Sequence, residues 1–151
     1  LGTQRELVAV RREAAEQARR EIEASCTRFV GDCVAELRRQ TAELCSEMLA
    51  SIDARGDVHQ KTLNRLQRFI ERFRSLNFAG DREMERELDR ARAELLSRTA
   101  EEYRGSGAAE LSLVQGLERL RAKARELASQ DTAALVESFG RMGRRRFALA
   151  S

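Results

Sequence analysis

The chain contains no proline and no tryptophan, and only one tyrosine among its 151 residues. Proline interrupts helices because it lacks a backbone N–H and clashes with the preceding turn, so its absence allows long helices. Alanine, leucine, glutamate and arginine dominate the composition, and all four favour the helical state. A chain of this length normally forms one domain around one core. The sequence therefore predicts an all-α protein with a single domain over residues 1–151.

Long apolar runs are also missing, because no stretch approaches the roughly 18 residues needed to span a bilayer. The first residues, Leu1 to Glu6, do not resemble a signal peptide. All three cysteines, Cys26, Cys33 and Cys45, fall in one expected helix, where residues seven or twelve apart cannot form a disulfide. We therefore expect a soluble, cytoplasmic protein with free thiols. Because the sequence does not begin with methionine, we also expect it to be a fragment or a processed form.

Residues and motifs that carry catalysis are scarce. His59 is the only histidine, and no nucleophile or base accompanies it at a local spacing. The cysteine spacings match neither a zinc site nor a C-x-x-C redox motif. A P-loop, a glycine-rich dinucleotide fingerprint, a nucleophile elbow and the Glu-x-x-His pairs of di-metal bundles are all absent from the sequence. We expect a non-catalytic protein without cofactor or metal, in which His59 and the cysteines have structural roles.

Capping residues and glycines divide the chain into four expected helices. Thr3 and Glu6 form a candidate capping box for the first helix, and Gly56 follows its end. Asp57 is the candidate cap of the second helix, with Gln60 at the capping-box position. The expected helices cover residues 3–54, 57–77, 81–104 and 108–139, with a basic C-terminal segment over 140–151. Residues 129–132 are a candidate break within the fourth helix.

The apolar face of the first helix recurs in repeating steps of 4, 4 and 3 along the sequence. This hendecad pattern is typical of a nearly straight helix. Its members are Ile22, Cys26, Val30, Cys33, Leu37, Thr41, Leu44, Met48 and Ile52. At 1.5 Å per residue this helix would be roughly 75 Å long, more than a compact bundle of this size can cover. We therefore expect part of it to project or to contact a partner.

The other helices present apolar faces at helical spacing. Their members are Leu63, Leu66, Phe69, Ile70, Phe73 and Leu76, then Met84, Leu88, Ala91, Leu95, Thr99 and Tyr103, and then Leu113, Leu117, Leu120, Ala124 and Leu127. These faces predict an antiparallel, coiled-coil-like bundle of four helices. If residues 77–81 only kink the chain, residues 57–104 form one helix and the bundle has three; the sequence favours a true break. Gly31 and Gly116, inside expected helices, either permit close helix approach or are local weaknesses.

A basic stripe runs along the second expected helix, although the net charge of the chain is only +3. Lys61, Arg65, Arg68 and Arg72 are spaced 4, 3 and 4 residues apart and share one face. Such a stripe could bind a nucleic-acid backbone or an acidic protein. It could equally lie in solvent or complement acidic residues of the third helix, namely Glu83, Glu87, Glu94 and Glu101.

The C-terminal segment is a second candidate surface. Leu135, Val136, Phe139 and Met142 share one face, and Arg141, Arg144, Arg145 and Arg146 add positive charge. A basic amphipathic helix of this kind could dock on a partner or, with less support, on an anionic membrane. Alternatively, the arginines only complement the negative end of the helix dipole.

These features predict a non-catalytic helical scaffold or interaction module that forms a homo-oligomer or joins a larger complex. The candidate partner-binding residues are Leu7, Val8, Val10, Leu135, Phe139 and Met142. The alternative is a protein that binds a nucleic-acid backbone through the basic stripe of the second expected helix. The candidate residues for binding an anionic partner are Lys61, Arg65, Arg68, Arg72, Arg144, Arg145 and Arg146. No small-molecule substrate is indicated.

Overall fold

The computed structural model describes residues 3–150, and the surroundings of side chains as far as residue 143. Within residues 3–150 the chain forms six α-helices and no strand. They are α1 (Thr3–Arg55), α2 (Gln60–Leu76), α3 (Arg82–Leu95), α4 (Ala100–Arg104), α5 (Gly107–Ala128) and α6 (Ala133–Ala150). The prediction of an all-helical fold is confirmed. The expected counts of four or three helices are wrong, because two further breaks divide the chain.

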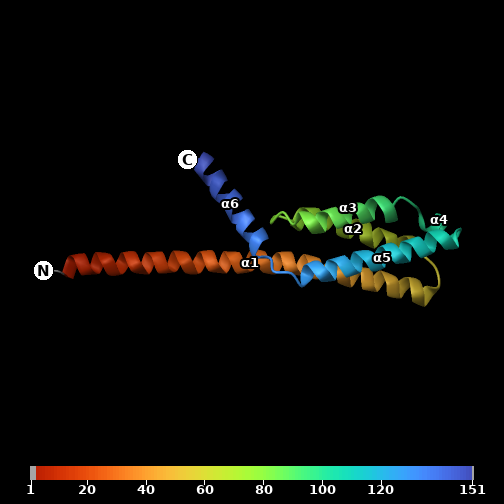
Figure 1. Ribbon diagram of the computed structural model, residues 1–151, viewed down its shortest axis with the longest axis horizontal. Coiled ribbons are helices and arrows are strands. Elements are labelled where there is room, and N and C mark those ends of the chain that lie inside the picture. The colour runs from red at the N-terminus through yellow and green to blue at the C-terminus, as the bar shows by residue number, and fades with distance from the viewer. Residues whose placement is uncertain (1–2, 151) are drawn as a thin grey trace.

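Helix α1 is a single uninterrupted helix of 53 residues, as its sequence predicts. At 1.5 Å per residue it is about 80 Å long. Only its second half packs against the other helices, and the first half extends away from them (Figure 1). We refer to residues 3–29 as the arm; every residue of it is exposed, and burial begins at Val30.

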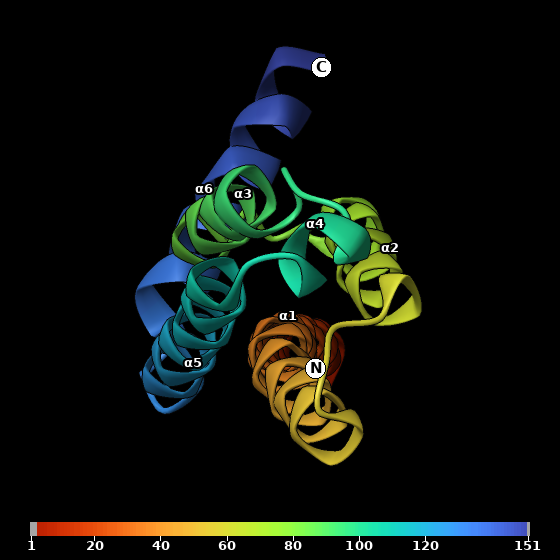
Figure 2. The same ribbon diagram turned by 90° about the vertical axis from the view of Figure 1, so that its right-hand side faces the viewer.

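The second half of α1 packs with α2, α3 and α5 around the main core, and α4 covers one end (Figure 2). Helices α2 and α5 run back along α1 (Figure 1). We refer to residues 30–128 as the bundle. The expected core positions of α2, α3 and α5 are buried, except Leu76, which is 45% exposed at the end of α2. Thr99 is also exposed, because it lies in the loop between α3 and α4, where the expected helix is interrupted.

The expected apolar face of α1 is buried only within the bundle. Thr41 and Met48 are almost completely inaccessible to solvent. Ile22 is 64% exposed and Cys26 is also exposed, so their prediction as core residues is wrong. The physical reason is that no other helix reaches the arm to cover them (Figure 1).

The chain breaks at residues 77–81, which confirms the favoured prediction of a turn and rejects the single helix over 57–104. Gly80 has φ of 73°, a conformation that glycine adopts without steric cost. Asn77 Oδ1 accepts a hydrogen bond from the Asp81 backbone N–H, and Asp81 caps α3 by accepting one from Met84 N–H. These local bonds replace the helical ones that the break removes.

Helix α2 starts three residues later than predicted, at Gln60. Its N-cap is His59, without a side-chain capping bond, so the expected cap at Asp57 is wrong. Val58 explains the shift: its side chain is fully buried against the main core, and its carbonyl accepts a hydrogen bond from Arg104. Burial of Val58 therefore holds residues 56–59 as a loop.

The expected helix over residues 81–104 divides into α3 and α4. Thr99 and Glu102 form a capping box at the start of α4, with both reciprocal hydrogen bonds present. Tyr103 Oη donates a 2.6 Å hydrogen bond to the carbonyl of Leu95, the last residue of α3. The break is thus stabilised from both sides.

The fourth expected helix, over residues 108–139, is divided by a loop at residues 129–132, the candidate break of the sequence. Asp131 Oδ1 accepts a hydrogen bond from Ala133 N–H at the start of α6. Helix α6 then continues through Gly140 and Gly143, so the expected boundary at residue 140 is wrong. It leaves the bundle at an angle to α1 (Figure 1).

Candidate protein-interaction surfaces

The arm exposes several large apolar side chains. Leu7, Val8 and Val10, predicted as partner-binding residues, are 51%, 54% and 60% exposed near its end. Ile22 and Phe29, closer to the bundle, are 64% and 63% exposed. Large exposed apolar side chains grouped on one element are typical of interaction sites. The side-chain bonds found in the arm are local, such as Gln17 to Glu21 and the Arg20–Glu16 ion pair.

Three phenylalanines meet at the base of the arm. The rings of Phe29 in α1 and Phe78 in the α2–α3 turn are stacked with centroids 6.4 Å apart. Phe139 of α6 meets Phe78 edge-to-face at 5.8 Å. Phe29 and Phe78 stay 63% and 49% exposed, so we refer to Phe29, Phe78 and Phe139 as the open aromatic cluster.

Helix α6 docks on α1 beside this cluster. Val30, Val34, Ala79 and Val136 form a small second core, with Leu135 and Phe139 packed against it. A Cβ atom added to Gly31 would lie 3.2 Å from Thr132 Oγ1, so glycine permits the close approach. Of the C-terminal residues predicted to bind a partner, Leu135 and Phe139 are therefore partly buried within the chain, and Met142 is 48% exposed. Arg144, Arg145 and Arg146 lie outside the described side chains.

The basic stripe of α2 is exposed but is not purely basic. Arg65 forms an ion pair with Glu47 of α1. The guanidinium of Arg72 lies 5.5 Å from the ring centroid of Phe69, a cation–π contact. Lys61 and Arg68 are exposed. Arg65 thus pairs with an acidic residue of α1 rather than with the acidic residues of α3.

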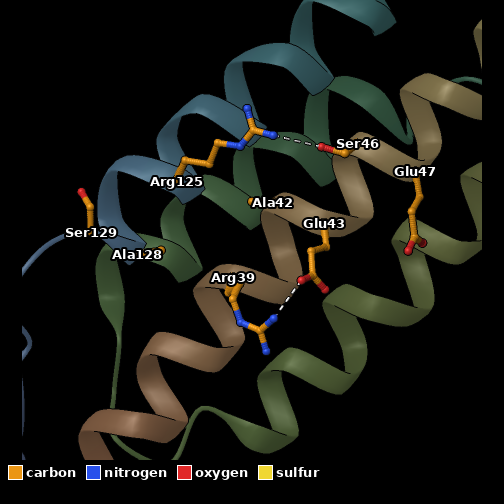
Figure 3. Close-up of a pocket in the computed structure, with 8 residues that line it drawn as sticks. All are labelled: Arg39, Ala42, Glu43, Ser46, Glu47, Arg125, Ala128 and Ser129. Atoms are coloured by element: carbon orange, nitrogen blue, oxygen red, sulfur yellow. Dashed lines mark hydrogen bonds and ion pairs between the residues drawn. The ribbon is translucent and has the colours of Figure 1, made fainter.

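A groove of about 560 Å³ lies between α1 and α5 (Figure 3). Ala42, Ser46 and Ala128 present only small side chains to it. Its charged groups are already engaged: Arg39 donates to Glu43 at 2.9 Å, and Arg125 donates to Ser46 Oγ at 3.4 Å. The groove is open, and the charged side chains along it, Glu47 included, already make contacts within the protein.

The histidine and the cysteines stay apart from one another. His59 Nε2 lies 2.8 Å from Asp57 Oδ1 at the surface. Burial raises the pKa of the Cys45 thiol to about 12, which keeps it protonated and unreactive. Within the described residues, no three histidine, cysteine or acidic side chains gather as a metal site.

Sequence reasoning missed the buried ion pair between Arg38 and Asp81. Arg38 Nη1 also donates a 2.8 Å hydrogen bond to the carbonyl of Leu127 near the end of α5. Helical periodicity places Arg38 beside the apolar face and Arg39 on the opposite side, but nothing in the sequence indicates an acidic partner for Arg38. The pair joins α1, α3 and α5, and so fixes the part of the bundle next to the arm.

Comparison of the chain with protein-family models, with curated proteins and with solved structures found no match. None of the helices in the described part of the chain has the length and apolar character needed to cross a bilayer.

Proposed function

We propose that this protein is a non-catalytic helical interaction module. In this proposal the packed helices form an antiparallel bundle that serves as a scaffold, and the arm is the surface that binds a helix of a protein partner. One observation carries the proposal: residues 3–29 form a continuous helix in which every residue, including Leu7, Ile22 and Phe29, is exposed.

The energetics favour an occupied arm. A helix in water gains little from propensity alone, and most helices in proteins are stabilised by packing of an apolar face. Burying one large apolar side chain contributes about 1.5–3 kcal/mol. A partner that covers Leu7, Ile22 and Phe29 would therefore gain several kcal/mol before the costs of association.

The bundle supports the arm as a binding surface, because α1 continues from the arm into the bundle without a break. The direction of the arm is consequently set by the packing of Val30, Leu37 and Met48 in the two cores. A partner then meets a helix that is already formed, which lowers the entropy cost of binding. The C-terminal candidates Leu135, Phe139 and Met142 lie on α6, which docks at the base of the arm, and Phe139 is connected to Phe29 of the arm through Phe78.

A photo-crosslinking residue placed in the full-length chain tests the proposal. We expect a residue at Ile22, on the apolar side, to form adducts with a protein, whether a copy of this chain or another polypeptide. A residue at Ala9, on the opposite side of the arm, is the matched control and should give few adducts. If Ile22 and Ala9 give equal adducts, or neither gives any, the arm is not a protein-binding surface.

A further inference from the structure

We infer that α6 is a latch at the base of the arm: it leaves the second core and loses its helical order while the bundle stays folded. This opening uncovers Val30, Val34 and Ala79, which α6 covers in the docked state. The inference goes beyond the proposed function, because it concerns a movement within the chain and needs no partner. It is supported by the contacts of α6, by its two glycines and by the loop that precedes it.

The contact between α6 and the rest of the chain is small and apolar. Within residues 133–143, Val136 is the only buried side chain, and Leu135 and Phe139 are partly buried against the second core. By comparison, α5 buries Leu113 and Leu117 completely in the main core. Hydrophobic stabilisation grows with the apolar area removed from water, so α6 is held far less tightly than α5.

The packing of α6 is also incomplete on the side of the α2–α3 turn. A cavity of about 350 Å³ lies between α6 and the start of α3, with Gly80 and Arg82 on one side and Leu135 and Met142 on the other. Figure 1 shows that the later turns of α6 point away from the bundle. Among the described side chains of α6, those of the first turns therefore provide most of the docking contact.

Polar bonds connect helices of the bundle to one another but do not hold the described part of α6. Arg38 of α1 bonds to Asp81 at the start of α3 and to the Leu127 carbonyl of α5. Within residues 133–143, by contrast, the side-chain ion pair is internal to α6 and joins Arg141 to Glu137. Release of these residues from the second core therefore breaks no hydrogen bond or ion pair of their side chains with the bundle.

Two glycines weaken α6 as a helix. Gly140 and Gly143 lie inside it, and a Cβ atom at either position would meet no atom within 4 Å. Close packing therefore does not require glycine there, in contrast to Gly116. Glycine inside a helix is less stable than alanine, and a helix of 18 residues alone in water is marginal. Without the second core, α6 should consequently lose its helical order.

The loop at residues 129–132 lets α6 leave without disturbing α5. Helix α5 has its own C-cap at Ser129, whose N–H donates to the Arg125 and Glu126 carbonyls. Helix α6 begins at a separate cap, where Asp131 Oδ1 accepts from Ala133 N–H. Because each helix end is satisfied by its own bonds, loss of α6 leaves the end of α5 intact.

Release of α6 would enlarge the apolar surface at the base of the arm. Val30, Val34 and Ala79 are buried while α6 is docked. They adjoin Phe29 and Phe78, two members of the open aromatic cluster that are already exposed. Under the proposed function, docked α6 thus covers part of the surface next to the arm, and its release makes that part accessible.

Thiol labelling at two matched alanines tests the inference. In a background with Cys26→Ser and Cys33→Ser, Ala79→Cys places a thiol in the second core and Ala91→Cys places one in the main core. Both alanines are 5% exposed, and the retained Cys45 is unreactive because burial raises its pKa to about 12. Labelling under native conditions should be at least about 100-fold faster at position 79, because local opening requires less free energy than global unfolding. Equal rates would show that α6 opens only when the bundle unfolds, and would overturn the inference.

A variant of α6 identifies the route by which the reagent enters. Gly140→Ala combined with Gly143→Ala strengthens the helix and should slow labelling at position 79 roughly tenfold, with no change at position 91. If the rate at position 79 stays the same, the reagent enters through the α2–α3 turn rather than past α6, and the latch is rejected.

Hydrogen exchange of the unsubstituted chain makes the same comparison without a change in either core. Amides of residues 136–139 in α6 should exchange at least about 100-fold faster than those of residues 117–124 in α5. Equal protection of the two helices would contradict the inference. The proposed function is tested separately, because the crosslinker at Ile22 reports on the arm and not on α6.

Discussion

Arg38 and Asp81, 43 residues apart in the sequence, form a buried ion pair with two hydrogen bonds of 2.7 and 3.1 Å. Their side chains are only 5% and 2% exposed. Asp81 also caps α3, and Arg38 donates to the Leu127 carbonyl, so each nitrogen of the Arg38 guanidinium makes one hydrogen bond. The pair joins three helices at the end of the bundle from which the arm projects.

The first prediction concerns this pair. Asp81→Asn retains a good helix cap but leaves the Arg38 guanidinium buried without a counter-charge, so we expect a loss of about 3–5 kcal/mol in the free energy of unfolding. Removing both charges with Arg38→Met and Asp81→Asn should cost less than Asp81→Asn alone. Urea denaturation measures the free energy of unfolding of both variants. The control is Arg39→Met, at an exposed arginine, which should lower the free energy of unfolding by less than about 1 kcal/mol. A small effect of Asp81→Asn would show that the pair contributes little.

The second prediction concerns Gly116 in the middle of α5. A Cβ atom at this position would lie 2.5 Å from Leu95 Cδ2, and Leu95 is only 4% exposed. Gly116→Ala should therefore destabilise the bundle by about 1 kcal/mol, because overpacking outweighs the gain in helix propensity. Gly140→Ala in α6 meets no atom within 4 Å and should be neutral or slightly stabilising. Equal thermal stability of Gly116→Ala and the wild-type chain would contradict this packing argument.

The third prediction concerns alkaline pH. Because burial raises the pKa of Cys45 from 9.0 to about 12, the unfolded chain loses this proton first. The contribution to stability is complete below about pH 9 and falls as the pH rises toward 12, by about 1.4 kcal/mol per pH unit. Cys45→Ala should reduce the dependence of the free energy of unfolding on pH between pH 9 and 11, as measured by urea denaturation at each pH. Cys26→Ala, at an exposed thiol, should leave this slope unchanged. Identical slopes in the two variants would rule out Cys45 as the source.

The fourth prediction concerns the basic stripe of α2. Arg65 is paired with Glu47, and Glu43 lies beside both along a groove between α1 and α2, so the stripe presents mixed charge to a phosphate backbone. We expect only weak binding to nucleic acid at low salt. Changing Arg65, Arg68 and Arg72 together to Glu should weaken this binding no more than the matched control does, in which Arg86, Arg90 and Arg98 are changed to Glu. Steeply salt-dependent binding that only the stripe variant loses would favour the nucleic-acid interpretation instead.

Local sequence signals determined several boundaries correctly. The break at residues 77–81 depends on Asn77, Gly80 and Asp81, whose turn and capping chemistry acts within a few residues. The capping box of Thr99 and Glu102 acts at equally short range, and its T-x-x-E signal was present but missed. By contrast, the loop before α2 could not be foreseen, because it depends on burial of Val58 against residues far away in the chain.

The sequence also placed the candidate surfaces correctly on helices but could not say which were covered. Ile22 and Met48 belong to the same expected apolar face, yet one is 64% exposed and the other is fully buried. Arg38 and Arg39 are adjacent arginines, yet only Arg38 is buried with an acidic partner.

The sequence by itself determined that this protein is helical, because helix propensity, apolar periodicity and capping act over one or two turns. It also determined that the first helix is too long for the rest of the chain to cover. Only the tertiary structure decided where that coverage ends, which charges are buried and which phenylalanines stay open at the base of the arm. These properties depend on contacts between segments distant in sequence, and no local pattern specifies them.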